Sequence, residues 1–326
     1  MLDVTLPAPD AAVREASPPA AWVLAEDKAG MLSQAIGLAE AAGLRPETRF
    51  LRARGLRSLL TPAFWWSPLS AVDPEALAPP TTDVVIGCGG MAAAVLSALR
   101  GRARTVIVQH PRRDIRNFDL VLAALHDEVT GPNVILTRTA LHRVTPERLA
   151  AAGRAWAPRF AHLPRPLVAV LVGGSNGRLH LSPAVGEHLA GQLADMLQRD
   201  RVGLVVTPSR RTDPAVRQAL ARKLRPLGAE VWDLTGENPY FGMLALADAI
   251  VVTCDSVSMV SEAVATRAPV LLAPLPGQSR RNQLFSRPLL EARRVRPFAG
   301  RLEVWPVEPV DDTAEAAAEM RRRLHL

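Results

Sequence analysis

Short runs rich in valine, isoleucine and leucine recur along this 326-residue chain, with helical patterns between them. The alternation is typical of parallel β-sheets wrapped by helices, because strands buried on both faces are almost continuously apolar. The first half holds six such runs, at residues 21–25, 48–51, 83–87, 105–109, 120–123 and 134–137. The second half holds five more, at residues 167–172, 202–207, 230–234, 249–253 and 270–273. We therefore predict an α/β fold with a parallel sheet in each half.

Helices are predicted between these strands, at residues 33–42, 91–100, 182–198, 214–224, 241–247 and 259–266. In the third of them, Ser182 can cap the free N–H groups, Pro183 suits the first turn, and apolar residues recur every four positions from Val185. Near the end of the chain, Asp312 and Glu315 have the spacing of a capping box, which predicts a final helix.

The length of the chain favours two domains of roughly 150 residues each. Pro158, Pro164 and Pro166 interrupt the pattern mid-chain and are interpreted as a linker, because proline cannot complete the hydrogen bonds of a helix or a sheet. We therefore expect domains at residues 1–160 and 161–326. The predicted architecture is two doubly wound, Rossmann-like domains that face a central cleft, with the C-terminal helix packing back.

The composition bounds the protein class. Hydrophobic residues make up 48% of the chain and charged residues 22%, so the chain can bury real cores. With neither a signal-peptide pattern nor a long apolar stretch, we expect a cytoplasmic protein, association with the inner membrane surface being left open. Cys88 and Cys254 are too few for a disulfide framework or a four-ligand zinc site, and no other metal-binding motif is present.

The net charge of +7 invites a nucleic-acid interpretation, but the positive residues are spread along the chain and aromatic residues make up only 4% of it. We expect no nucleic-acid partner. Phosphate, nucleotides and anionic lipids all remain candidate ligands. Basic residues cluster only briefly, at 112–113, 210–211, 280–281 and 321–323.

Two glycine-rich loops follow predicted strands. Residues 87–92 fit G-x-G-x-x-A, but the next strand ends in Gln109 and His110 rather than in the acid that a dinucleotide site needs, so a tight turn is favoured over an NAD site. The loop at 173–177 fits both a serine nucleophile elbow and a phosphate-binding loop. An elbow needs a helix at once and a well-placed histidine, whereas His188 lies within a helix and His325 at the terminus. We therefore favour phosphate binding by Gly173, Gly174, Ser175 and Asn176.

Further polar segments follow the later strands and should meet at the same edge of the second sheet. Ser209, Arg210 and Arg211 can neutralise a diphosphate, and the alternative is a solvated turn. Asn238 and the run from Asp255 to Glu262 come next, with Ser256 and Ser258 as candidates for phosphate and Glu262 for ribose hydroxyls. A plain helix cap by Asp255 or Ser256 is the alternative. In the first domain, Asp27 and His110 follow strands and are the candidate general bases.

Together these segments resemble the mitochondrial-fission ELM-like family, whose bacterial members are often labelled nucleoside-diphosphate-sugar epimerases. The resemblance covers most of the chain, and it departs from the family at Cys254, where we expect an acid. It rests on residues 28–30, 34, 37–40, 141–146, 173–177, 209–212, 238–244 and 255–262.

This resemblance implies a GT-B-like fold, the two-domain architecture of many metal-independent glycosyltransferases. The epimerase label fits poorly, because the Y-x-x-x-K pair of such reductases is excluded by a single tyrosine, Tyr240, with Leu244 four positions on. The plant members are linked with mitochondrial division, which implies no chemistry.

We therefore expect a GT-B-type glycosyltransferase without a metal or cofactor, which takes a nucleoside-diphosphate sugar on the second domain and an acceptor, such as a membrane lipid or a glycan, on the first. Arg210 or Arg211 would stabilise the departing phosphate. One alternative is a non-catalytic scaffolding or membrane-associated protein that uses the basic cluster at 321–323. Another is a serine hydrolase that acts through Ser175.

Overall fold

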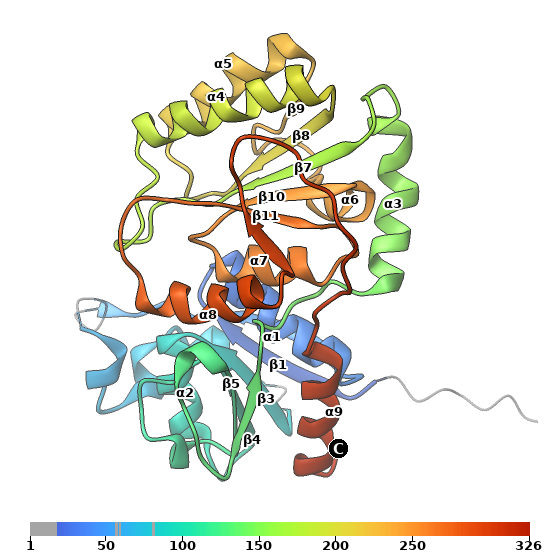
Figure 1. Cartoon of the computed structure of the whole chain (residues 1–326). Coiled ribbons are helices and arrows are strands. Elements are labelled where there is room, and N and C mark those ends of the chain that lie inside the picture. Colours follow the sequence, from blue (N-terminus) through green and yellow to red (C-terminus); the bar gives the residue numbers. More distant parts are fainter. Residues whose placement is uncertain (1–17, 56–57, 59, 80–81) are drawn as a thin grey trace, which may run out of the picture.

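The computed structural model describes residues 18–55, 58, 60–79 and 82–326. In this part of the chain, the strands form two six-stranded sheets in which every neighbouring pair is parallel, and each sheet is the centre of one lobe (Figure 1). The predicted α/β class with two doubly wound sheets is confirmed.

The first sheet has the order β2-β1-β3-β4-β5-β6. Helix α2 (Gly90–Leu99) covers one of its faces, whereas α1 (Ala29–Ala41) and the C-terminal helix α9 (Thr313–Leu324) cover the other. The last helix therefore does pack back, against the first lobe. The strands are β1 (Ala20–Ala25), β2 (Arg45–Phe50), β3 (Val84–Cys88), β4 (Arg104–Val108), β5 (Leu120–Ala124) and β6 (Val134–Thr137).

The second sheet has the order β12-β11-β10-β7-β8-β9. The chain starts at β7, moves outward to β9 and returns to the other side of β7, so the direction of winding reverses between β7 and β10. The strands are β7 (Leu167–Val172), β8 (Gly203–Pro208), β9 (Glu230–Val231), β10 (Ala249–Thr253), β11 (Val270–Ala273) and β12 (Val295–Pro297). The last of these was not predicted.

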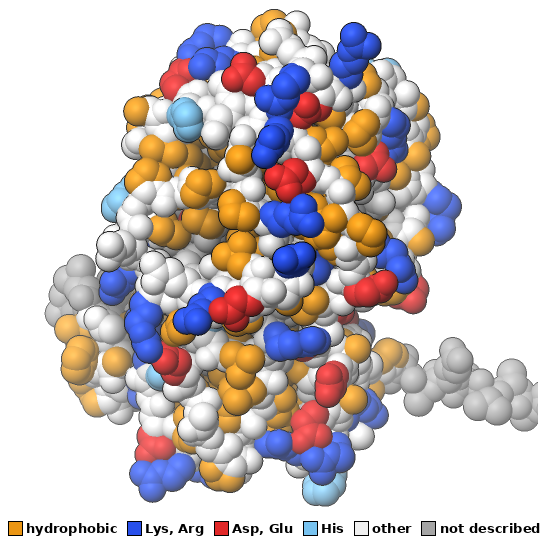
Figure 2. Space-filling model, in the orientation of Figure 1, with side chains coloured by type: hydrophobic (Ala, Val, Ile, Leu, Met, Phe, Trp, Pro, Cys, Tyr) orange, Lys and Arg blue, Asp and Glu red, His pale blue; other side chains and the backbone are white. Residues whose placement is uncertain are grey.

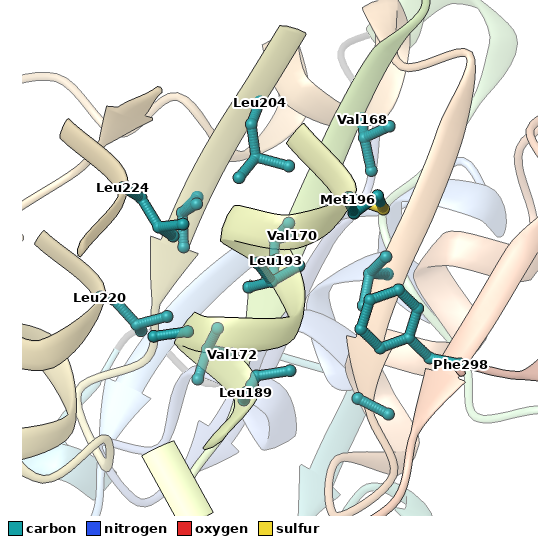
Figure 3. Close-up of a cluster of buried hydrophobic side chains, with 14 of the residues drawn as sticks. Val168, Val170, Val172, Leu189, Leu193, Met196, Leu204, Leu220, Leu224 and Phe298 are labelled. Carbon is teal, nitrogen blue, oxygen red and sulfur yellow. The ribbon is translucent and has the colours of Figure 1, made fainter. Parts of the chain in front are cut away.

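Alternation along β7 divides the core of the second lobe into two layers. Val168, Val170 and Val172 pack under α4 (Pro183–Asp200) and α5 (Pro214–Leu224), as Figure 3 shows for Leu189, Leu193 and Met196 of α4. The residues in between face α6 (Tyr240–Leu246), α7 (Val257–Val264) and α8 (Arg280–Glu291). The predicted stripe of α4 therefore faces the sheet, and Ser182 caps the helix as expected.

The linker interpretation of Pro158 is wrong, because this residue lies within a helix, α3 (Pro146–Phe160). Thr145 caps the helix and Pro146 occupies its first turn, while Pro158 falls near the other end, on the exposed side. Trp156 and Phe160 pack against the second lobe. The boundary at residue 160 stays a prediction. Helix α3 packs against the second lobe, and α9 packs against the first.

The chain passes between the lobes twice, before α3 and before α9, and the two passages are bonded together. Arg138 donates to Asp312 through its backbone N–H and its guanidinium, with 2.9 Å from Nε to Oδ1. The final helix is confirmed, but the predicted capping by Asp312 is wrong, because this carboxylate binds Arg138 instead. The ion pair between Arg138 and Asp312 thus holds the two connections side by side.

Candidate functional site

Segments that follow the carboxyl ends of strands in the two sheets meet between the lobes. Helix α7 of the second lobe lies close to the start of α1, and the view in Figure 1 places it between the two sheets. The position is the one where ligands bind in open α/β sheets, outside the carboxyl ends of strands at the point where the winding reverses. The candidate site therefore centres on the reversal between β7 and β10.

Asp255 is the centre of the second-lobe side of the site. It follows β10, its carboxylate is fully buried, and Oδ2 accepts hydrogen bonds from the Gly174 amide at 3.0 Å and from Arg211 at 3.2 Å. The other oxygen, Oδ1, has no hydrogen-bond partner among the described residues. A Cβ at Gly173 would collide with this carboxylate, so only glycine lets the loop approach it. The glycine loop is thus shaped around a buried acid.

The other loop residues are bonded to neighbouring segments of the second lobe. The Gly173 amide donates to Thr253 at 2.8 Å, and Asn176 accepts from the Leu179 amide at 2.9 Å. Ser175 is exposed, and its hydroxyl oxygen accepts from the Leu181 amide at 2.9 Å. The amides of Gly173 and Gly174, which we expected on the diphosphate, are therefore already used.

Within the described part of the chain, the Ser175 hydroxyl is bonded to the Leu181 amide and not to a histidine. His180, which the sequence reasoning overlooked, follows the same loop and is exposed, as is His188 within α4. The elbow geometry is missing as well, since α4 begins ten positions after the first loop glycine, at Pro183. The arrangement gives no support to a serine hydrolase.

Ser209, Arg210 and Arg211 follow β8 at the same edge. The Ser209 hydroxyl accepts from the Arg211 amide at 3.2 Å, which shapes the turn. Arg211 reaches inward to Asp255, and half of its side chain is exposed. Arg210 crosses to the first lobe, where it lies 3.3 Å from Asp27. Arg210 therefore lies at the contact between the lobes, and Arg211 lies beside Asp255 at the edge of the second sheet.

Helix α7 brings three more of the predicted residues to the contact between the lobes. Ser256 caps the helix by accepting from the Met259 amide at 3.3 Å, so the cap alternative describes it correctly. Ser258 accepts from Gln34 of α1 at 3.3 Å. A Cβ at Gly30 would lie only 2.8 Å from the Ser258 hydroxyl, so this glycine allows the starts of the two helices to approach each other.

Glu262 is buried in that contact. Its Oε1 accepts from Ser33 at 3.0 Å and its Oε2 from the Tyr240 hydroxyl at 2.5 Å. Burial raises the pKa of Glu262, and burial beside this carboxyl also raises the pKa of Tyr240. The carboxylate that we expected to meet ribose is thus engaged across the lobes. Asn238 is exposed and accepts from the Tyr240 amide at 3.0 Å, which orders the start of α6.

The two candidate bases of the first lobe lie on its exposed rim. The Asp27 side chain is 72% exposed and faces Arg210. His110 is exposed, and its Nδ1 accepts from the Arg112 amide at 2.8 Å. Their assignment as general bases stays a prediction.

Sequence reasoning missed a buried group on the first-lobe side, formed by His126 and Asp127 after β5. Neither ring nitrogen of His126 has a hydrogen-bond partner among the described residues, and Nε2 lies 3.8 Å from Asp127. Asp127 accepts from Arg281 of α8 at 3.0 Å, and the His126 ring packs edge-on against Phe285. Burial lowers the pKa of His126 to about 4. No motif marks these residues in the sequence.

The cysteines differ from each other. Cys88 ends β3 and is fully buried, and burial raises the pKa of its thiol. Cys254 is only partly buried, although burial also raises its pKa. The described residues contain no group of three or more histidine, cysteine, aspartate or glutamate side chains that could hold a metal ion.

Comparison with known proteins gives the family. The family model described as mitochondrial fission ELM1 matches residues 29–324, which is most of the chain. The chain belongs to the mitochondrial fission ELM1 family. It is 32% identical over 274 residues to the mitochondrial fission protein ELM1 of Arabidopsis thaliana, a match that covers 74% of this chain and 64% of the plant protein. The chain therefore spans less than two thirds of that relative.

A second relative is an uncharacterized protein of Rickettsia prowazekii, 24% identical over 91% of this chain and 96% of its own length. Among solved structures, MurG of Acinetobacter baumannii has a TM-score of 0.51 at 15% identity and covers 94% of this chain and 90% of its own. A UDP-GlcNAc 2-epimerase of Neisseria meningitidis bound to UDP-GlcNAc has a TM-score of 0.51 at 11% identity, covering 93% and 99%. These likenesses show the GT-B-like fold.

Proposed function

We propose that this ELM1-family chain binds a nucleoside-diphosphate sugar between its lobes and transfers the sugar to an acceptor on the first lobe. The observation that carries the proposal is the convergence of the glycine loop, Asp255 and Arg211 at the point where the winding of the second sheet reverses. Solved proteins of the same fold are named for nucleotide sugars, including a Medicago truncatula UGT71G1 complexed with UDP-glucose, with a TM-score of 0.51 at 10% identity over 93% of each chain.

The helix ends around the cleft favour an anion. Helices α1 and α2 of the first lobe begin without a side-chain cap and without an acidic residue in their first turn. Their free N–H groups carry partial positive charge. The capped start of α7 lies opposite α1, and Arg210 and Arg211 border the same space. A diphosphate would satisfy these groups together.

The roles of individual residues follow from their contacts. Arg211 would hold the diphosphate and neutralise the charge that develops on it as the sugar leaves, the work that a metal ion does elsewhere. Arg210 would do the same after exchanging its contact with Asp27, which would free that carboxylate to deprotonate the acceptor. Glu262 would reach a ribose hydroxyl by giving up its hydrogen bond with Ser33.

The test is calorimetric titration of the whole chain with UDP, GDP, CDP and ADP, and with their sugars, in the presence of EDTA. We expect one nucleoside diphosphate to bind without metal and Arg211→Ala to weaken it. If none of the four nucleoside diphosphates bound, or if Arg211→Ala and Glu262→Ala bound the nucleoside diphosphate as tightly as the wild type does, the proposed site would be contradicted.

Mass spectrometry and NMR of the product would then separate three reactions. Transfer gives a glycosylated acceptor and a free nucleoside diphosphate. Epimerisation, the activity in the names of several solved proteins with this fold, gives an altered sugar instead. Hydrolysis gives the free sugar in the absence of any acceptor. We expect the free nucleoside diphosphate to accumulate only when an acceptor is added.

The structure also bears on the scaffolding alternative, which relied on the basic cluster at 321–323. Arg322 and Arg323 pair with Glu319, at 2.6 Å each, and Arg321 donates to the Ala42 carbonyl at 2.6 Å. Arg321 and Arg323 are therefore held against the first lobe, whereas the Arg322 side chain is 71% exposed.

A further inference from the structure

The first lobe exposes large aromatic side chains in the segment between β2 and β3. Phe64 is 73% exposed and Trp66 is 76% exposed, while Leu60 nearby is 41% exposed. Trp65, between the two aromatics, is 5% exposed and packs in the core with Leu51, Ala71 and Val72. Because the buried ring anchors the segment, its neighbours are held outward. Exposed aromatic residues grouped in this way mark an interaction site.

The segment is a closed excursion from the sheet. Ala53 and Val72 form an antiparallel bridge at its base, where the Arg54 amide donates to Ala71 at 2.9 Å and the Asp73 amide to Arg52 at 3.1 Å. Pale blue in Figure 1, it lies at the left edge of the lower lobe, where Figure 2 shows hydrophobic side chains together on the surface. The bridge makes the tip a protrusion of defined shape.

The charge around this tip is positive. The sequence from 55 to 72 contains no acidic residue. Arg113, after β4, donates to the Pro62 carbonyl, and Arg112 beside it is exposed. Arg52 at the base is exposed as well, whereas Arg54 is partly neutralised by Asp73 at 3.6 Å. Aromatic side chains that can enter the membrane–water interface, with arginines nearby, suit a bilayer with anionic headgroups.

We propose that the tip at residues 60–66 docks this protein onto an anionic membrane surface. Phe64 and Trp66 would enter the headgroup region, and Arg52 and Arg112 would meet lipid phosphates. None of the described helices is long and apolar enough to cross a membrane, so the contact would be with one leaflet. Because Pro62 packs near Gly90 at the start of α2, the acceptor side of the cleft would lie close to the bilayer.

The test is sedimentation of the full-length chain with phosphatidylcholine vesicles that contain or lack phosphatidylglycerol. The wild type should bind chiefly the anionic vesicles, and Phe64→Ala with Trp66→Ala should weaken binding about ten-fold. The matched control is Val304→Ala with Leu290→Ala, which removes exposed hydrophobic side chains from the second lobe and should bind like the wild type. Absence of wild-type binding, or an equal loss in the control, would overturn the proposal.

The charge contribution is tested by Arg52→Glu with Arg112→Glu against Arg267→Glu with Arg301→Glu, which change the net charge equally. Only the first pair should weaken binding to anionic vesicles. Quenching of tryptophan fluorescence by brominated lipid should fall in Trp66→Phe and persist in Trp305→Phe. If both charge pairs or both tryptophan variants behaved alike, the docking site would be wrong.

Two readouts separate this proposal from others. All variants should keep the thermal stability and the nucleoside-diphosphate affinity of the wild type. Failure of vesicle binding would therefore leave the proposed donor site unaffected, and failure of nucleoside-diphosphate binding would leave membrane docking unaffected. Light scattering without lipid tests a second copy as the occupant. A dimer that is lost in the Phe64 and Trp66 variant, together with no vesicle binding, would overturn membrane docking.

Discussion

The two lobes are built differently where they face each other. On the second lobe, a buried carboxylate, Asp255, organises the glycine loop and Arg211 through hydrogen bonds, and Asn176 of the loop donates to the Asp255 carbonyl. On the first lobe, α1 and α2 begin without side-chain caps, and the buried His126 has no hydrogen-bond partner among the described residues. The second-lobe loops are thus held in place by Asp255, although its Oδ1 has no hydrogen-bond partner among the described residues, whereas α1 and α2 of the first lobe begin uncapped. We infer that the second lobe holds the constant part of a ligand and the first lobe the variable part.

The first-lobe side should produce the largest effect on stability. Since burial lowers the pKa of His126 from 6.5 to about 4, the unfolded state binds more protons between these values. The contribution of neutral His126 to the free energy of unfolding should therefore be fully present above pH 6.5. It should fall by about 3 kcal/mol as the pH drops to about 4. Nearby Asp127 favours the protonated ring and Arg281 opposes it.

Urea denaturation at several pH values measures this loss. His126→Gln should flatten the acid slope, and His162→Gln, a substitution on the surface, should leave it unchanged. An acid slope that survives in His126→Gln would show that another group causes it.

On the second-lobe side, Asp255→Ala should abolish the nucleotide response and destabilise the chain. It leaves the buried Gly174 amide without an acceptor, which costs about 1–3 kcal/mol. Asp233→Ala is the control, because Asp233 is exposed and accepts hydrogen bonds from Thr235. Chemical denaturation and calorimetry measure the two effects. Normal nucleotide affinity in a folded Asp255→Ala variant would contradict the comparison.

Arg211 and Arg210 offer a finer comparison. We expect Arg211→Ala to weaken nucleoside-diphosphate binding about ten-fold, because its guanidinium is oriented by Asp255. Arg210→Ala should change affinity only about two-fold, since Arg210 makes one exposed pair with Asp27. Titration of both variants measures the ratio, and the opposite ranking would place the diphosphate nearer to the first lobe.

The contact between the lobes should give the smallest effect. Burial raises the pKa of Glu262 above its usual 4.5, so the folded state holds a proton that the unfolded state has lost, and stability falls as the pH rises through this window. Glu262→Gln keeps an acceptor for Tyr240 and should remove that slope with little other change. The pH dependence of unfolding checks this, and an unchanged slope would contradict it.

Much of the fold was predictable because buried parallel strands are short apolar runs, and every predicted strand corresponds to an observed one. Helices α3 and α8 were missed because each contains a proline, Pro158 and Pro288, that the surrounding lobe tolerates. The edge position of the polar loops was also predictable from strand order.

The partners within the site were not predictable. Glu262 meets Ser33, and Asp255 occupies the space that a Cβ at Gly173 would need. Both are contacts between residues more than 80 positions apart in the sequence. His126 and Asp127 carry no motif, and only packing against Arg281 and Phe285 distinguishes them.

The most direct test of the central claim is hydrogen–deuterium exchange of the full chain, with and without the nucleoside diphosphate that binds best in titration. We expect new protection in the loops at 173–177 and 207–212, at the start of α7, and at the start of α1 in the facing lobe. Protection confined to other surfaces of either lobe, with these four segments unchanged, would contradict it.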